Sequence, residues 1–316
     1  MVSQKQAMQR QPRGAYAIRR IRRCAGLYLM LVPAVVLVIL FAYWPMYGVT
    51  IAMKDFSAPL GIGGSPWAQP LYKYMLRFFN SYQFSNTVKN TLWISFYTLI
   101  ASFPIPIILA LGINQMRRQR FKRFFQTVIY LPHFISTVVM VGLLLIWLSP
   151  SSGLVGNLFR AFGAEAPNLM GSKTAFASIY VWSDVWQHMG WNSIIYIAAL
   201  AAVDPTLYEA ATVDGASRFQ RIRFIDFPML LPTAVILLVM SAGQMMNVGF
   251  EKVYMMQNNL NLSVSEVIST YTYKIGITNT QYSYSTAINL FNTIINVILL
   301  ITVNQVAKRL SENSLW

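Results

Sequence analysis

The chain has 316 residues, of which 55% are hydrophobic and only 11% charged, and its net charge is +15. Soluble domains carry about 25% charged residues, so this composition indicates an integral membrane protein and excludes a large soluble domain. A single cysteine, Cys24, excludes a disulfide framework, and two histidines are too few for a histidine-rich metal site. The Lys and Arg residues cluster at the ends of apolar segments, which argues against nucleic-acid binding.

The first 24 residues contain seven basic residues and no acidic one. An apolar segment, residues 25–44, follows, and about 20 apolar residues are needed to cross a bilayer. A signal peptide would have a shorter apolar segment and a cleavage site of small residues, whereas this segment ends in bulky side chains. We therefore expect a basic segment followed by an uncleaved first membrane span.

Five further apolar segments predict five more spans, at about residues 90–113, 127–148, 174–201, 229–250 and 283–306. Pro104 and Pro106 predict a kink within the second span. The expected fold is an all-α membrane protein with six transmembrane helices, in which residues 1–24 form a basic segment, 25–306 the transmembrane domain and 307–316 a tail. No internal repeat is visible in the sequence.

The distribution of basic residues predicts how the spans are oriented. With the N-terminus inside, the inner loops and termini carry 17 of the 25 Lys and Arg residues, and the outer loops carry eight. Because positive charge accumulates on the cytoplasmic side, both termini and the loop 204–232 are predicted to be cytoplasmic.

The loop 204–232 has helix signals of its own. Asp204 is a good N-cap and Pro205 suits the first helical position, where a missing N–H costs nothing. Leu207, Tyr208 and Ala211 follow at helical spacing, and Gly215 then supplies a backbone conformation that other residues adopt at a cost. A second apolar stripe follows, flanked by Arg218 and Arg221. These two arginines either pair with acidic groups of a partner chain or simply belong to the basic residues expected in an inner loop. The pattern predicts a short amphipathic helix that docks on a partner chain.

Polar residues inside the spans are costly, so they are candidates for a solute path. Asp184 is the only acidic residue inside a predicted span, and His188 lies four residues later on the same helix face. The other candidates are Gln187, Trp191, Asn192, Gln244, Asn247, Asn289 and Asn292. Amides bond hydroxyls and aromatic faces stack on sugar rings, so this set fits a sugar path. Hydrogen bonding between helices would require the same residue types, and Asp184 with His188 is either a buried bonded pair or part of the path.

The sequence contains no phosphate-binding Gly-x-x-x-x-Gly-Lys-[Ser/Thr] motif and no recognisable catalytic set of side chains. We therefore predict that the chain is not an enzyme and cannot itself hold ATP.

The loop 204–232 resembles the cytoplasmic EAA loop of ABC-importer permeases. The resemblance rests on Glu209-Ala210-Ala211, Asp214-Gly215-Ala216, Ile225 and Pro228 at their family spacing. Phe227 is a departure, because Leu usually precedes the Pro, but the exchange keeps the residue apolar. In that family the loop forms a coupling helix that docks in a groove of an ATPase subunit. The resemblance implies this role for Leu207, Tyr208, Glu209, Ala210, Ala211, Asp214, Gly215 and Arg218.

Other segments are similar to the oligosaccharide permeases called LplB-like, among them Tyr43-Trp44-Pro45-Met46-Tyr47-Gly48, the segment 284–292 and the closing Ser314-Leu315-Trp316. Within this type the chain looks particularly similar to the permease of a bacterial alginate-oligosaccharide importer. The resemblance implies an inner-membrane heterodimer with a second permease, two ATP-binding subunits and a periplasmic solute-binding protein. ATP and Mg²⁺ would bind to the ATPase subunits, and this chain would hold no cofactor.

The substrate stays open at this level. Mildly basic outer loops suit an acidic oligosaccharide, whereas Asp184 would repel a uronate unless it is protonated or paired with His188. A neutral oligosaccharide is the alternative. Two other function classes also remain, an ion-coupled secondary transporter that uses Asp184 and His188 as a proton relay, and a membrane receptor or scaffold.

Overall fold

The computed structural model of the protein describes residues 24–310. Within this range every regular element is a helix, and the one β-type contact is an isolated bridge between Lys54 and Trp67. The predicted all-α fold is therefore confirmed. The basic residues before Cys24 and the closing Ser314-Leu315-Trp316 lie outside the described residues, and the division into segment, transmembrane domain and tail stays a prediction.

Four helical segments of the described chain are long and apolar enough to cross a membrane, namely Ala25–Met53, Tyr82–Asn114, Arg218–Ala242 and Tyr282–Arg309. Two further candidates are pairs of helices that meet at a bend. The bend is 95° between Gln119–Phe134 and Thr137–Trp147, and 73° between Phe176–Ala201 and Pro205–Val213. Counting each bent pair as one span gives six, as the sequence predicts.

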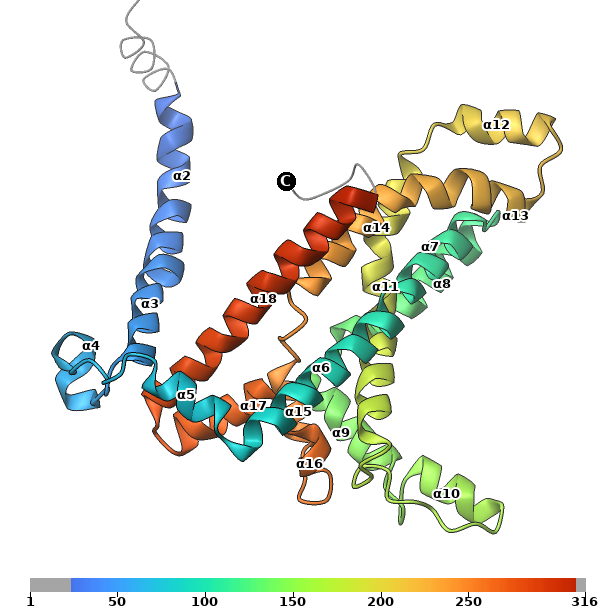
Figure 1. Cartoon of the computed structure of the whole chain (residues 1–316). Helices are drawn as coiled ribbons and strands as arrows, with labels where there is room; N and C mark the ends of the chain where they lie inside the picture. Colours follow the sequence, from blue (N-terminus) through green and yellow to red (C-terminus); the bar gives the residue numbers. More distant parts are fainter. Residues whose placement is uncertain (1–23, 311–316) are drawn as a thin grey trace, which may run out of the picture.

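The first span runs through α2 (Ala25–Val38), the π-turn η1 (Ile39–Tyr43), α3 (Trp44–Met46) and the 3₁₀ segment η2 (Tyr47–Met53). Helix α2 stands apart from the other spans (Figure 1) and contains no buried residue. Its apolar side chains, such as Leu29 at 73% exposed, therefore need lipid or another chain to cover them.

The segment after the first span contains η3 (Ala58–Leu60), α4 (Gly61–Gly64) and α5 (Lys73–Phe79). Its charged groups are paired locally, because Asp55 accepts hydrogen bonds from the Lys73 ammonium at 2.8 Å and the Tyr74 hydroxyl at 2.6 Å. These bonds, that from Lys73 first, lower the pKa of Asp55 below its ordinary value.

The second span joins α6 (Tyr82–Ser102) and α7 (Pro104–Asn114), with the expected irregularity at Phe103, just before Pro104. The third is broken into α8 (Gln119–Tyr130), the 3₁₀ turn η4 (Leu131–Phe134) and α9 (Thr137–Trp147). This differs from the single span 127–148 that the sequence suggests. Pro132 removes a backbone donor, and the Ser136 hydroxyl starts a new helix by accepting from the Val139 N–H at 3.3 Å.

After α10 (Leu154–Ala161), helix α11 (Phe176–Ala201) crosses the centre of the bundle. It belongs to two of the three apolar clusters, one shared with α6, α9 and α15, the other with α7 and α14. It also touches α8 closely at Gly190, where an added Cβ would lie 2.0 Å from the Ile129 carbonyl oxygen. Helix α11 therefore fixes the positions of most other spans.

The chain then forms α12 (Pro205–Val213), α13 (Arg218–Arg221), the π-turn η5 (Ile222–Asp226) and α14 (Phe227–Ala242). Helix α12 projects at one end of the bundle, which we call the α12 end (Figure 1). Helix α14 ends eight residues before the predicted end of the fifth span. At Gly243 an added Cβ would lie 2.7 Å from Leu300 Cδ1, so the chain passes very close to the last helix there.

The segment 243–249 does not continue α14. The end of the bundle opposite α12 contains the elements that follow, namely α15 (Phe250–Met256), α16 (Leu262–Ser265), α17 (Ile268–Tyr273) and the π-turn η6 (Lys274–Thr278). Helix α18 (Tyr282–Leu310) then returns toward the α12 end. It packs with α5 and α17 through a third apolar cluster that contains Phe78 and Ile288.

Candidate functional site

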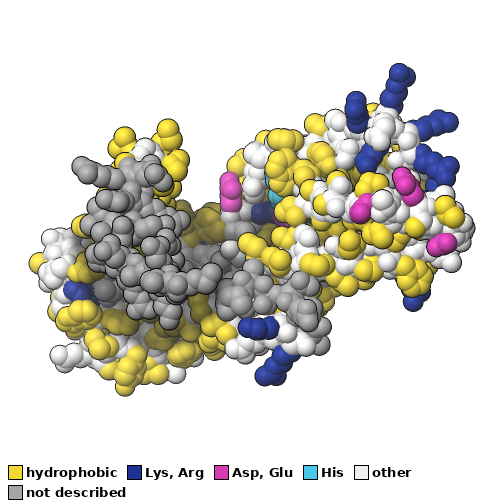
Figure 2. Space-filling view, turned by 90° about the horizontal axis from the view of Figure 1, so that it is seen from above, with side chains coloured by type: hydrophobic (Ala, Val, Ile, Leu, Met, Phe, Trp, Pro, Cys, Tyr) yellow, Lys and Arg dark blue, Asp and Glu magenta, His cyan; other side chains and the backbone are white. Residues whose placement is uncertain are grey.

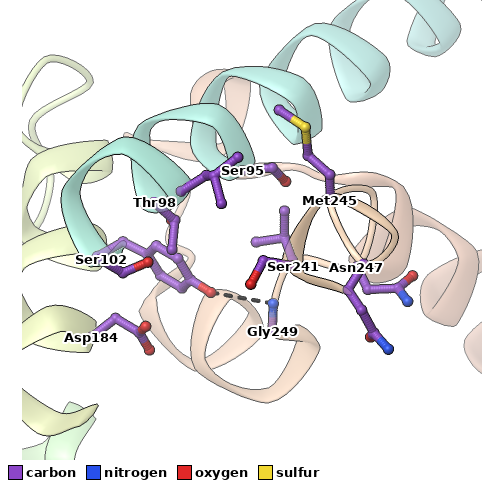
Figure 3. Close-up of a pocket in the computed structure, with 12 residues that line it drawn as sticks. Ser95, Thr98, Ser102, Asp184, Ser241, Met245, Asn247 and Gly249 are labelled. Carbon is purple, nitrogen blue, oxygen red and sulfur yellow. Dashed lines mark hydrogen bonds between the residues drawn. The ribbon is translucent and has the colours of Figure 1, made fainter. Parts of the chain in front are cut away.

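A polar cavity of about 270 Å³ lies between α6, α11 and the segment 241–249. Figure 3 shows Ser95, Thr98 and Ser102 on α6 facing Ser241 and Asn247 across this space, with Asp184 reaching in from α11. Three of the nine residues predicted for a solute path line it, namely Asp184, Gln244 and Asn247. Polar groups from three segments of the chain therefore meet at one place among apolar spans.

Two hydroxyls of this cavity have no hydrogen-bond partner. Ser95 Oγ and Thr98 Oγ1 are buried, and neither finds a donor or acceptor among the described residues. Most buried polar groups in proteins are hydrogen-bonded, so unpartnered hydroxyls in a cavity favour a site for a polar molecule. Sequence reasoning missed both, because a Ser or Thr in a span usually bonds to its own helix backbone.

The segment 243–249 presents amide side chains because it has left the helical ladder. Asn247 Oδ1 accepts hydrogen bonds from Asn292 Nδ2 at 3.0 Å and Asn296 Nδ2 at 3.2 Å, both on α18. Asn296 Oδ1 in turn accepts from the Met246 N–H at 2.9 Å. The Asn face of α18 therefore holds this segment in place. Interrupted helices of this kind line solute paths in transporters.

Asp184 belongs to a charged cluster with two partners. His188 Nδ1 and Lys252 Nζ each lie 3.4 Å from Asp184 Oδ1. Lys252 Nζ also donates to the Tyr180 carbonyl at 3.2 Å, and its side chain is only 6% exposed. The cluster is therefore compact, with Lys252 almost fully buried and Asp184 and His188 partly exposed, and the positive charge of Lys252 balances the negative charge of Asp184.

Lys252 is the main residue that sequence reasoning missed at this site. It lies just beyond the predicted fifth span, so the sequence analysis counts it among the basic residues of the outer loops. In the structure α15 packs into the bundle, with Val253 and Met256 buried beside it. The available signal was Asp184 itself, because a buried charge requires a partner of opposite sign and His188 carries a charge only when it is protonated.

The other predicted path residues lie outside this cavity. Gln187 is buried and donates to the Ile135 carbonyl at 2.7 Å, so it ties α11 to the break in the third span. Trp191 stacks on His133 with ring centroids 4.4 Å apart. Asn192 lines a neighbouring cavity of about 180 Å³ that shares Ser102 and Ser241 with the first. Asn289 lines a separate pocket beside α17, and Asn292 donates a hydrogen bond to Asn247.

The loop at the α12 end has the local structure that its sequence predicts. The Asp204 carboxylate caps α12 by accepting from the Thr206 N–H at 2.9 Å, and this bond lowers the pKa of Asp204. Gly215 ends the helix with φ +71°, and the Ala216 N–H donates to the Ala211 carbonyl at 2.8 Å. This arrangement is a Schellman motif, in which the left-handed glycine reverses the chain. A capping box between Ser217 and Gln220 then starts α13.

The outer surface of this loop exposes apolar side chains, namely Leu207, Val213, Phe219 and Phe224, at 43–88% of their area. Glu209, Ala210, Asp214 and Arg218 are exposed as well, while Ala211 is half-buried. Seen from above, basic side chains gather over this end of the molecule with acidic ones among them (Figure 2). An exposed apolar patch within a charged rim is typical of a protein-docking surface.

Tyr208 is the exception on α12, because its hydroxyl points into the bundle. It donates to Asp226 Oδ1 at 2.6 Å, and Asp226 also accepts from Asn114 Nδ2 at 3.2 Å and Gln115 Nε2 at 2.7 Å. Burial, and then the bond to Asp226, raise the pKa of Tyr208 to about 12, so the phenol stays a hydrogen-bond donor. The predicted contact of Tyr208 with a partner chain stays a prediction.

No group of three or more His, Cys, Asp or Glu side chains within residues 24–310 is arranged to hold a metal ion. The expectation that the chain binds neither metal nor cofactor stays a prediction.

Residues 102–312 match the protein family described as "Binding-protein-dependent transport system inner membrane component". Among curated relatives, protein LplB of Bacillus subtilis (strain 168) is 38% identical over 94% of this chain and 92% of its own length. The polygalacturonan/rhamnogalacturonan transport system permease protein YteP of the same organism is 40% identical over 92% of this chain and 90% of its own length.

Comparison with solved structures also finds chains of ABC transporters. A chain of a bacterial ABC transporter involved in the import of the acidic polysaccharide alginate superposes with a TM-score of 0.86 and is 35% identical, covering 94% of this chain and 99% of that one. A second structure, of a bacterial alginate ABC transporter in complex with an alginate pentasaccharide-bound periplasmic protein, gives a TM-score of 0.85 at 34% identity, covering 94% of this chain and 99% of that one.

Proposed function

Because the chain belongs to the family of binding-protein-dependent transport system inner membrane components and is a permease subunit of a sugar ABC importer, we propose that it carries an acidic oligosaccharide of the alginate type across the membrane. It is a transport subunit and not an enzyme, as the sequence predicts. Family membership also sets aside the ion-coupled transporter and the receptor or scaffold.

The solute path of this proposal runs through the cavity between α6, α11 and the segment 241–249. Its support is the pair of unpartnered hydroxyls, Ser95 Oγ and Thr98 Oγ1, beside the amides of Gln244 and Asn247. Sugar hydroxyls both donate and accept hydrogen bonds, so they satisfy this lining. At about 270 Å³ the cavity lies just below the usual range of about 300–1,000 Å³ for ligand pockets. A second permease subunit would supply the remaining wall.

The one acidic residue that lines the cavity, Asp184, is compatible with an acidic cargo because its charge is balanced. Asp184 alone would repel a carboxylate, but Lys252 Nζ lies 3.4 Å from it and balances its charge. This removes the objection that the sequence alone raises against a uronate, and His188 adds a positive charge whenever it is protonated. One relative is named for polygalacturonan and rhamnogalacturonan transport, and the superposed structures are of alginate transporters.

The partners follow from the surfaces. The exposed apolar patch of α12 and α13 would dock on one ATP-binding subunit, with Glu209 and Arg218 at its rim, and ATP and Mg²⁺ would bind to the two ATPase subunits. The uncovered α2 would pack on the second permease. The α12 end would face the cytoplasm, and the opposite end would receive the solute from the periplasmic binding protein. Closure of the ATPase dimer would then move α12 and switch the spans from inward-open to outward-open.

The test is ATP hydrolysis by the complete reconstituted complex with its binding protein. We expect uronate oligosaccharides, presented on the binding protein, to stimulate ATP hydrolysis several-fold and neutral oligosaccharides of equal length to leave it near its basal rate. Equal stimulation by neutral oligosaccharides would overturn the acidic cargo and favour the neutral alternative, for which an arabinooligosaccharide permease, 28% identical over 73% of this chain, offers a precedent.

A further inference from the structure

Asp226 is a buried carboxylate that the proposed solute path does not use. It is 0% exposed, and within residues 24–310 no Lys, Arg or His forms an ion pair with it. Its two oxygens accept instead from three neutral donors, the Tyr208 hydroxyl, Asn114 Nδ2 and Gln115 Nε2. A buried charge without a counter-ion is costly, and an apolar residue often serves stability as well or better. The arrangement therefore favours a role beyond stability.

The groups of this cluster come from three separate segments of the chain. Tyr208 lies on α12, Asn114 and Gln115 end α7, and Asp226 lies in the π-turn that precedes α14. Every other residue of α12 except Ala211 is exposed. The hydroxyl of Tyr208, 2.6 Å from Asp226 Oδ1, is therefore the main polar contact between α12 and the bundle. Single π-turns within helices are frequent at functional positions.

The two helices joined at Asp226 are also those that lead to the solute cavity. Helix α7 continues α6, which carries Ser95 and Thr98, and the two form the single span Tyr82–Asn114. Helix α14 leads directly to the unwound segment that carries Gln244 and Asn247. A displacement of α12 would thus reach two walls of the cavity through one carboxylate.

We propose that Asp226, held by Tyr208, Asn114 and Gln115, is the link that passes the movement of α12 to the two cavity-lining spans. This proposal rests on the proposed function and adds positioning residues to it. Directional hydrogen bonds to both carboxylate oxygens fix the orientation of α12 relative to α7 and α14. Apolar contacts at the same place would allow α12 to tilt without moving the spans.

The test measures sugar uptake per ATP hydrolysed in proteoliposomes that contain the complete complex. Tyr208→Phe removes one hydroxyl and keeps the ring. The matched control is Tyr72→Phe, just before α5, because Tyr72 is exposed and its hydroxyl has no hydrogen bond within the described chain. We expect Tyr208→Phe to lower sugar transported per ATP by about tenfold, because α12 loses its hydrogen bond to the Asp226 carboxylate. Asp226→Asn should lower it as well, and the double variant should do no more than the stronger single one.

A second measurement separates linkage from folding. Amide hydrogen exchange of the assembled complex should speed up in α12 of the Tyr208→Phe variant and stay unchanged in α11. An unaltered ratio of sugar to ATP with an assembled complex would overturn the link. So would faster exchange throughout the bundle, because it would reveal a purely structural role. Absence of ATP-dependent uptake by the unaltered complex would instead count against the proposed function.

Discussion

Replacing Lys252 with Met is the most informative single perturbation of the charged cluster. Met has a similar length and removes the cation that lies 3.4 Å from Asp184 Oδ1 and donates to the Tyr180 carbonyl. The Lys side chain is 6% exposed and the Asp side chain 26% exposed. The substitution therefore leaves a mostly desolvated carboxylate with His188 as its remaining partner.

The expected cost follows from the burial of the pair. Removing one partner of a fully buried ion pair costs about 3–5 kcal/mol, whereas an exposed pair is worth about 0.2–1 kcal/mol. Because the carboxylate keeps some solvent access and His188, we expect Lys252→Met to lower the free energy of unfolding by about 2–3 kcal/mol. The midpoint of thermal unfolding should then fall by about 5–10 °C, with about 2–4 °C per kcal/mol for chains of this order of size.

The assay is thermal unfolding of the purified complex, with Lys73→Met as the control. That substitution breaks an exposed pair, in which the Lys73 side chain is 45% exposed and the Asp55 side chain 39%, and it should shift the midpoint by no more than about 4 °C. Adding Asp184→Asn to Lys252→Met removes the unpaired charge and should restore most of the lost stability. If Lys252→Met has no effect, or the double variant unfolds as early as the single one, the electrostatic reasoning is refuted.

Three further outcomes follow from local geometry. Gly190→Ala places a Cβ against the backbone of α8 and should destabilise the protein by about 1–3 kcal/mol in thermal unfolding, whereas Gly142→Ala, with open space around it, should not destabilise it. The double variant Ser95→Ala/Thr98→Val should reduce sugar uptake without lowering the midpoint of thermal unfolding, because neither hydroxyl has a hydrogen-bond partner among the described residues. A lower midpoint together with normal uptake would contradict this prediction. Gly215 has φ +71°, a left-handed conformation that is costly for Val, so Gly215→Val should uncouple ATP hydrolysis from uptake in vesicles. Unchanged uptake per ATP would contradict this prediction.

Much of the fold follows from local sequence signals. Six apolar segments predict the spans. The ends of α12 follow from Asp204, Pro205 and Gly215, and the structure places these three residues as expected. These features depend on a few consecutive residues, so they are visible without any tertiary information. The family of the chain was also predictable, because the EAA pattern combines fixed residue types at fixed spacing.

The remaining features depend on contacts between distant segments. Nothing local reveals that Lys252 turns back to meet Asp184, 68 residues earlier in the chain. The bond between Tyr208 and Asp226 joins residues of one loop, yet it becomes meaningful only once α7 brings Gln115 to the same carboxylate. The break at η4 and the early end of α14 similarly depend on packing rather than on the hydropathy of the segments.

The central claim is that the cavity between α6, α11 and the segment 241–249 is the solute path, and thiol labelling tests it most directly. Cys24 is the only cysteine, so Thr98→Cys in a Cys24→Ser background gives a single reporter on this chain. We predict that a charged, water-soluble thiol reagent modifies this chain in the working complex. Transport of a uronate oligosaccharide should slow the modification. A reporter that the reagent never reaches, or that reacts at the same rate while sugar is being transported, would contradict the account.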